Sequence, residues 1–271
     1  MLAAATMEHV NSPDSLRVAA IRYYMDKLNA WHAALPLTMR LATLSSEDSD
    51  MLPPNQRFAL LLVHLLYLGA VTLLHRPILA AVANLSRNGT WEVDASPEQV
   101  RGFENDCITA ASQGARVVAL LKADGTFPKQ CWIVVHQGFD SCCILLFSAA
   151  QKLFHRKYDG LHDTIIQIED CIDLLVWCSS SSSAAGHFVD LLRPLYERLR
   201  ELFAVLTNTG PTRVDDGSSY LHRNVKAEPL DLADLNYSHA PASSPELLDF
   251  VEGTTQLLLD PRGATQAFHR P

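Results

Sequence analysis

Six cysteines and one histidine–aspartate pair are the residues of this 271-residue chain whose types could bind a metal or catalyse a reaction. Metal-binding and redox-active cysteines usually occur in short pairs such as Cys-x-x-Cys, because two thiolates must reach one ion or each other. No such pair occurs, and the six are scattered through apolar stretches: Cys107, Cys131, Cys142, Cys143, Cys171 and Cys178. We predict buried free thiols that behave as small apolar side chains, with no bound metal or other cofactor in this chain.

His136 and Asp140 are four residues apart, which places them on one face of a helix, where an acid and a base can exchange a proton. Catalysis would also need a nucleophile, a metal site or a phosphate-binding loop. The motifs Gly-x-Ser-x-Gly and His-Glu-x-x-His and the glycine-rich phosphate loop are all missing from the sequence. We therefore predict a hydrogen-bonded structural pair and a chain that is not an enzyme.

The formal net charge of −8 argues against direct binding of this chain to nucleic acid. Affinity for a phosphate backbone comes mainly from clustered lysine and arginine side chains that release counterions. The first ten residues lack the basic stretch and apolar run of a signal peptide, so we expect a reducing compartment.

Apolar residues recur every three or four positions along most of the chain, which is the spacing of one helix face. The pattern predicts an all-α multi-helix bundle over residues 15–208, after a flexible N-terminus at 1–14. Ser96, Pro97 and Gln99 form a strong helix start, with a cap, a first-turn proline and a capping-box partner. The expected helices are 15–35, 58–74, 96–121, 128–155, 165–178 and 188–206.

The stretch Phe58–Leu74 is almost continuously apolar, so a transmembrane helix has to be weighed against a buried one. A span needs about 20 apolar residues, and this stretch is shorter and contains His64 and Tyr67. We favour a central helix covered by its neighbours, with no membrane partner. Pro77 is then expected to kink the chain or begin a new helix, before a loop at 84–94.

The last predicted helix carries an apolar seam in alternating steps of four and three residues. Such a seam packs one helix against another, either inside the bundle or between two copies of the chain. We favour core packing over a homodimer seam, because the repeat is barely long enough for a coiled coil. Its members are Phe188, Leu192, Leu195, Leu199, Leu202 and Leu206.

Residues 209–271 break this pattern with repeated prolines and polar residues, and they are predicted to form a disordered acidic tail. From Asp215 onward the tail has nine acidic and four basic residues, a net charge of −5. Acidic and bulky apolar residues are mixed in it as they are in activation segments, although incidental composition explains this equally well. The candidate contact residues are Leu230, Leu232, Leu235, Leu247, Leu248, Phe250, Leu257 and Leu258.

Two short patterns in the tail match weak modification and docking signals. Val225–Glu228 resembles an acceptor site for a small ubiquitin-like modifier, with Lys226 as the attachment point. Pro229–Ala233 resembles a corepressor-docking motif. Patterns this short often arise by chance in a polar segment.

Four segments, taken together and in this order, resemble the fungal-specific transcription factor domain, the middle homology region of fungal zinc-cluster regulators. The resemblance covers about 17–206, and its most distinctive phrase is Leu-His-Arg-Pro at 74–77. The other three are the Trp and Leu-Pro helix at 23–41, the alanine-rich helix at 107–121 and the aromatic helix at 132–147. The residues that carry it are Trp31, Leu35, Pro36, Leu74, His75, Arg76, Pro77, Cys107 and Trp132.

The resemblance implies a nuclear regulatory domain that acts in control of RNA polymerase II transcription. Family members bind DNA through zinc held by an N-terminal cysteine cluster, which this sequence lacks. The chain would then correspond to the C-terminal portion of a longer regulator, a truncated gene product or a natural fragment. Implied partners are coactivators or corepressors, a DNA-binding protein or second copy, and a small-molecule effector. The alternatives are a helical binding or scaffold protein without a transcriptional role and, behind it, a helical enzyme acting on apolar substrates.

Overall fold

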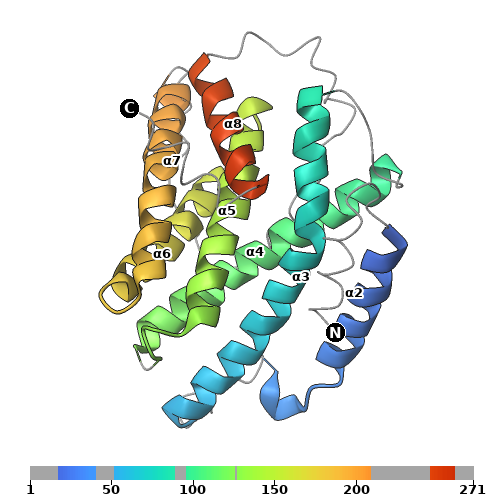
Figure 1. Ribbon diagram of the computed structural model, residues 1–271, viewed down its shortest axis with the longest axis vertical. Helices are drawn as coiled ribbons and strands as arrows, with labels where there is room; N and C mark the ends of the chain where they lie inside the picture. The colour runs from blue at the N-terminus through green and yellow to red at the C-terminus, as the bar shows by residue number, and fades with distance from the viewer. Residues whose placement is uncertain (1–17, 41–51, 89–95, 126, 209–244, 260–271) are drawn as a thin grey trace, which may run out of the picture.

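The computed structural model describes residues 18–40, 52–88, 96–125, 127–208 and 245–259. All regular secondary structure within these residues is helical, which confirms the predicted all-α fold (Figure 1). The helices, labelled as in Figure 1, are α2 (Val18–Ala33), the short 3-10 helix η1 (Leu37–Met39), α3 (Pro54–Asn88), α4 (Pro97–Asp124), α5 (Trp132–Phe154), α6 (Leu161–Ser179), α7 (Ser183–Asn208) and α8 (Pro245–Leu259).

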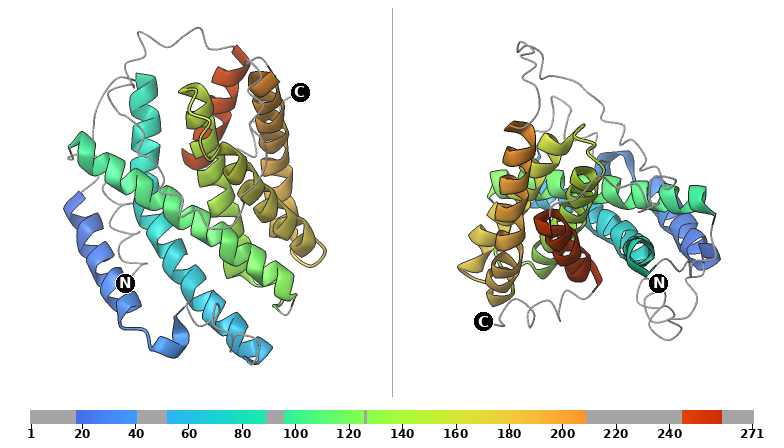
Figure 2. Two further views of the ribbon diagram at one scale, coloured as in Figure 1. Left: turned by 180° about the vertical axis from the view of Figure 1, so that it is seen from behind. Right: turned by 90° about the horizontal axis from the view of Figure 1, so that it is seen from above.

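Helix α5 is the centre of the bundle. It packs against α3, α4, α6, α7 and α8, while α4 runs obliquely across the back of α3 and α5 (Figure 2). Nearly every side chain between Val134 and Leu153 is buried, because helices cover α5 on most of its circumference. The apolar character of this stretch therefore reflects its central position rather than one amphipathic face.

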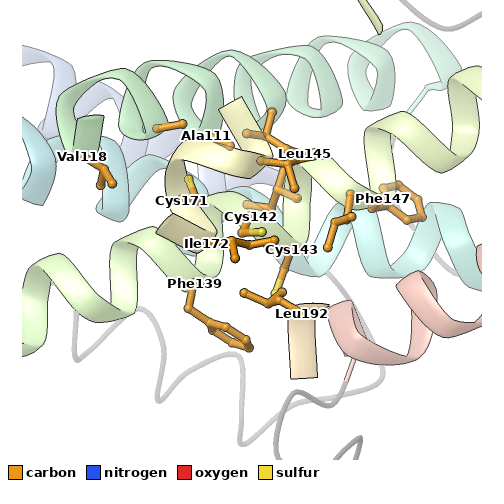
Figure 3. Packing of buried hydrophobic residues seen from close by; sticks show 14 of the residues in the cluster. Ala111, Val118, Phe139, Cys142, Cys143, Leu145, Phe147, Cys171, Ile172 and Leu192 are labelled. Atoms are coloured by element: carbon orange, nitrogen blue, oxygen red, sulfur yellow. The ribbon is translucent and has the colours of Figure 1, made fainter. Parts of the chain in front are cut away.

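The cysteines lie mostly inside this core. Figure 3 shows Cys142, Cys143 and Cys171 among apolar side chains of α5, α6 and α7. All six cysteines are free thiols, five of them buried and Cys131 partly so, as the sequence predicted. Burial raises the pKa of Cys142 well above its ordinary value, because a thiolate would be poorly solvated there. The buried thiols are therefore packing groups of low reactivity.

Helix α3 runs without a break through Pro77 and extends to Asn88, so neither a new helix at this proline nor a loop beginning at residue 84 is found. A proline inside a helix removes one backbone hydrogen bond and crowds the preceding turn. Ile78 and Leu79, directly after it, are completely buried. Their burial against the bundle offsets the local cost of the proline, which sequence alone did not reveal.

Helix α4 begins as the sequence predicted. The Ser96 hydroxyl accepts a hydrogen bond from the Gln99 backbone N–H, and the Gln99 side chain accepts one from the Ser96 N–H. The helix ends at Gly125, whose φ of 63° is a left-handed conformation that suits glycine.

Helices α3, α4 and α5 approach one another closely at two glycines. A Cβ atom on Gly69 of α3 would lie only 2.3 Å from Oε1 of Gln137, and one on Gly114 of α4 would lie 2.8 Å from Oγ of Ser141. Gln137 and Ser141 are buried on α5, where the Gln137 amide donates to the Ser141 hydroxyl. Glycine at both positions therefore lets a small polar pair fit inside an apolar crossing.

The seam of α7 packs inside the bundle. Leu192 and Leu199 are completely buried, and the helix contacts α5, α6 and α8. This agrees with the prediction of core packing within one chain. Leu206 is helical, but its side chain is outside the described set.

Two helical stretches, Pro54–Val82 and Trp132–Phe154, are long and apolar enough to cross a membrane by length and composition alone. Their most apolar windows are 61% and 83% buried within the bundle. Core helices of helical bundles meet the same criteria, so these two stretches are weak evidence for a membrane protein.

The predicted disordered tail at 209–271 differs from the structure in one part. Residues 245–259 form α8, which packs against α3, α5 and α7. Burial of its apolar residues explains why this part is helical. The remainder of the tail, and residues 1–14, lie outside the described residues.

Candidate functional site

The most distinctive phrase of the sequence, Leu74–Pro77, lies where α3, α5 and α8 meet. Leu74 points into the main core, and Arg76, two positions later, faces α5 and α8 instead. Nη1 of Arg76 lies 3.0 Å from Oδ1 of Asp140 on α5. Both side chains are about four-fifths buried, at 18% and 21% exposure, so solvent screens this ion pair only in part.

The same guanidinium also holds the end of α8. Nε of Arg76 donates to the backbone oxygen of Leu258, at 3.1 Å, in the last turn of that helix. The last carbonyls of a helix have no partner within it and carry partial negative charge, so a cation is favourable there. Arg76 therefore joins three helices that are distant in sequence, and we call this contact of Arg76, Asp140 and Leu258 the arginine junction.

Two opposing effects set the charge of Asp140. Burial raises the pKa of this carboxyl above its ordinary value, while the neighbouring Arg76 and His136 act in the opposite direction. The ionised form thus depends on the guanidinium that faces it. The predicted hydrogen bond between His136 and Asp140 is replaced by this ion pair, because Arg76 reaches the carboxylate from α3. His136 is exposed, and its ring lies near Trp132 and Phe188.

His75 is buried beside the arginine junction, on the side of α4. Its Nδ1 donates to the Val71 backbone oxygen at 2.8 Å, and its ring lies 5.4 Å from that of Phe103. Burial lowers the pKa of His75 and favours the neutral ring. A helix break at Pro77, as expected from the sequence, would place His75 and Arg76 at a helix end, where they would satisfy free carbonyls of their own helix. Arg76 instead caps another helix, since α3 continues past Pro77.

The other residues of the family-like segments do not gather at one place. Cys107 is buried on α4, and its thiol contacts the Thr72 backbone oxygen of α3 at 3.9 Å. Trp31 and Trp132 are exposed on α2 and at the start of α5, at 45% and 69%. Leu35 and Pro36 lie between α2 and η1. Of these residues, Leu74–Pro77 and Cys107 therefore lie near one another, where α3 contacts α4.

The candidate activation residues divide into two groups. Leu230, Leu232 and Leu235, and also Lys226, lie outside the described residues. The α8 members are helical, and four of them are buried: Leu247, Phe250, Leu257 and Leu258. Only Leu248 is exposed among the α8 candidates, at 47%.

The docking of α8 was not predicted, although the sequence contains a signal for it. Its apolar positions follow helical spacing, and the helix starts at Pro245, which fits a first helical position. Gly253 allows α8 to approach α7, because a Cβ there would lie 3.1 Å from Cδ2 of Leu195. The acidic residues Asp249 and Glu252 lie on the exposed side. This helix is amphipathic, with its acidic side outward.

A second polar contact joins α2 to α3 through two histidines. Nε2 of His64 donates to the Met39 backbone oxygen at 2.8 Å, which leaves its Nδ1 to accept from Nε2 of His32 at 3.0 Å. The His32 ring stacks on Tyr67, with centroids 3.9 Å apart. Burial first, then the nearby His64 and Arg40, lowers the pKa of His32. We call this contact the histidine pair.

Metal binding is a natural question for two adjacent imidazoles. The ring centroids of His32 and His64 are 5.1 Å apart when the two nitrogens are 3.0 Å apart, an end-to-end arrangement that fits a hydrogen bond. Within the described ranges no group of three histidine, cysteine, aspartate or glutamate side chains is placed to hold an ion. The histidine pair is a hydrogen-bonded contact between α2 and α3.

No protein-family model, curated protein or solved structure matches this chain. The fold and the arginine junction define it as an all-α bundle whose C-terminal helix is capped by an arginine of its longest helix.

Proposed function

We propose that this chain is the regulatory, middle homology domain of a transcription regulator of the fungal zinc-cluster type. Such a domain would act in the nucleus, in control of RNA polymerase II transcription. The observation that carries the proposal is the arginine junction: the most family-like phrase supplies the residue that holds the acidic, apolar C-terminal helix. The Leu74–Pro77 phrase and the α8 part of the candidate activation segment are thus in direct contact.

The proposed role needs no DNA contact by this chain. Its net charge of −8 disfavours phosphate binding, so DNA would be reached through another part of the regulator or a partner protein. Coactivators or corepressors would bind the acidic and apolar segment, since amphipathic helices commonly dock in apolar grooves of partner proteins. A small-molecule effector would act by favouring one of two arrangements of the bundle.

A reporter assay tests this proposal. Residues 209–271 are fused to a heterologous DNA-binding domain and compared with a fusion in which Leu230, Leu232 and Leu235 are alanine. We expect activation from the first fusion and a loss of several-fold from the second, because apolar side chains carry the partner contact. Silence from a well-expressed 209–271 fusion would contradict an activating role for the segment.

A helical binding or scaffold protein without a transcriptional role is the second candidate. The burial of four of the five α8 candidates favours it, because a helix that only completes a core needs no partner. Localisation separates the two candidates. A tagged full chain that stays outside the nucleus, alone and with its binding partners present, would favour the scaffold.

A further inference from the structure

We infer that α8 is a releasable helix held by the arginine junction, and that its docked state covers the apolar face a coactivator would bind. This inference rests on the function proposed above and concerns how that function is controlled. The same side chains cannot be buried in the bundle and inserted in a partner's groove. Release of α8 is therefore a condition for any activity of this helix.

The burial of α8 makes the two states exclusive. Phe250, Leu257 and Leu258 are each exposed by 2% or less, so they offer no surface to another protein while α8 is docked. The outward side carries Leu248, Asp249 and Glu252, a single large apolar residue among acids. Helix-in-groove recognition uses several apolar residues at spacings of three, four and seven. The docked helix lacks such a face.

The buried face of α8 makes less apolar contact with the bundle than the buried faces of the core helices do. Two threonines interrupt it, Thr254 at 1% and Thr255 at 5% exposure. The Thr254 hydroxyl bonds to the Val251 oxygen of its own helix, so this hydrogen bond survives release. Gly253 adds no side chain to the contact with α7 and disfavours the helix itself. Undocking α8 thus gives up less apolar contact than removal of α5 or α6 would.

Arg76 is the residue on which docking depends most specifically. Its guanidinium bonds both to α8, at the Leu258 oxygen, and to α5, at Asp140. The apolar contacts of α8 resist only separation from the bundle, whereas this bond also fixes the position of its last turn. Loss of the guanidinium leaves the carbonyl of Leu258 without that donor and Asp140 without its counter-charge.

Helix α3 also contains a matched control for Arg76. Arg57 pairs with Asp124 of α4 at the same distance, 3.0 Å, with side-chain exposures of 30% and 20%. It lies near the start of α3, nineteen residues before Arg76 along the same helix. Arg57→Met removes an equivalent ion pair without touching α8, so it controls for the general effect of losing one.

Hydrogen exchange on the full chain tests whether the arginine junction holds α8 in place, and it does so independently of any role in transcription. We expect the amides of 245–259 to exchange about tenfold faster in Arg76→Met than in the wild type, since a charge-assisted hydrogen bond is lost. Amides of α4 and α6 should exchange at wild-type rates. Arg57→Met should leave α8 unchanged. Equal α8 rates in Arg76→Met and wild type would overturn the inference.

A second variant guards against general unfolding caused by an unpaired Asp140. Phe250→Ala lies on α8 itself and leaves the ion pair intact. If α8 is separately releasable, faster exchange is confined to 245–259 in this variant too. Faster exchange throughout the bundle in both variants would show that α8 unfolds only with the rest, and the inference would fail.

A reporter assay distinguishes failure of the inference about α8 from failure of the proposed function. The full chain, fused to a heterologous DNA-binding domain, is compared as wild type, Arg76→Met and Arg57→Met, beside the 209–271 fusion. We expect several-fold more activation from Arg76→Met than from the other two full-length chains. If the 209–271 fusion and the wild-type full chain are equally active, docking of α8 does not block activation, and that part of the inference is overturned. A silent 209–271 fusion contradicts the proposed function, while the exchange experiment still decides whether Arg76 holds α8.

Discussion

Helices α2 and α8 both pack against α3, but different contacts hold them there. They lie on different sides of α3 (Figure 2). Most buried residues of α2 join a small separate apolar cluster with α3 and α4, whereas those of α8 join the main core. Polar contacts join α2 to α3 through the histidine pair and a hydrogen bond from Tyr67 to Asn29, whereas the charged arginine junction holds α8. A helix near one end of the sequence can therefore be part of the main core, as α8 is, while a helix near the other end packs mainly in a smaller cluster, as α2 does.

The largest expected effect comes from removing the main apolar residue of each helix. Phe250→Ala should cost about 4 kcal/mol and Ile21→Ala about 3 kcal/mol of docking free energy, because both side chains are fully buried. Hydrogen exchange should show the first loss in α8 and the second in α2. Loss of protection in both helices from either variant would show that they are coupled and would break the comparison.

A change in the shared support should affect both helices together. Gly69→Val places atoms against Gln137 where α3 crosses α5, and should cost about 2 kcal/mol. Urea unfolding followed by circular dichroism measures this loss. Gly102→Val is the control, because a Cβ on Gly102 meets nothing within 4 Å. Equal stability of the Gly69 variant and wild type would mean that the crossing adjusts freely.

Glu104 on α4 should make the free energy of unfolding of the whole bundle depend on pH. Burial raises its pKa to about 7, so the folded state favours the protonated form. The associated stability is present below the unfolded pKa, near 4.5, and is lost as the pH rises through 7. Glu104→Gln should therefore be more stable than wild type by about 2 kcal/mol at pH 8, and similar to it at pH 4. Denaturant unfolding at both pH values measures the difference, and no gain at pH 8 would contradict it.

The histidine pair gives the smallest and most local effect. The folded pKa of His32 is lowered, so its contribution to stability is complete above pH 6.5 and declines as the pH falls below that value. Arg40 adds to this loss, because it faces the same ring. We expect amide exchange in α2, corrected for intrinsic rates, to be faster at pH 5.5 than at pH 7.5, with α8 unaffected.

Two substitutions check the origin of that effect. His32→Phe keeps a ring to stack on Tyr67 but cannot be protonated, so the pH dependence of α2 should disappear. His162→Phe, at an exposed position of α6, should retain it. A pH dependence that survives His32→Phe would assign the effect to other groups.

Local sequence signals predicted local structure well. The capping box at Ser96 and the helical spacing of the apolar residues each involve residues that are close in sequence, so they can be recognised without any tertiary contact. They predicted most of the helices, the start of α4 and the burial of five cysteines. Pro77 shows the limit of such signals: its local cost is fixed by the backbone, but the burial of Ile78 and Leu79 outweighs it.

The contacts of the candidate site could not be predicted in the same way. Arg76 and Leu258 are 182 residues apart, and no periodic pattern relates them. The spacing of Asp140 from His136 predicts a pair within one helix, but the partner of Asp140 is Arg76, from another helix. The helical spacing within 245–259 was a usable signal for α8, obscured by its acidic and proline-containing surroundings.

The sequence by itself determined that this chain is helical, that its thiols are buried and that its negative charge gathers toward the C-terminal end, because these properties depend on residue type and short spacing. Only the tertiary structure decided which helix is central, which arginine caps which helix and whether Phe250 faces a partner or the core. Those outcomes depend on distances between remote segments, which are fixed only when the helices pack.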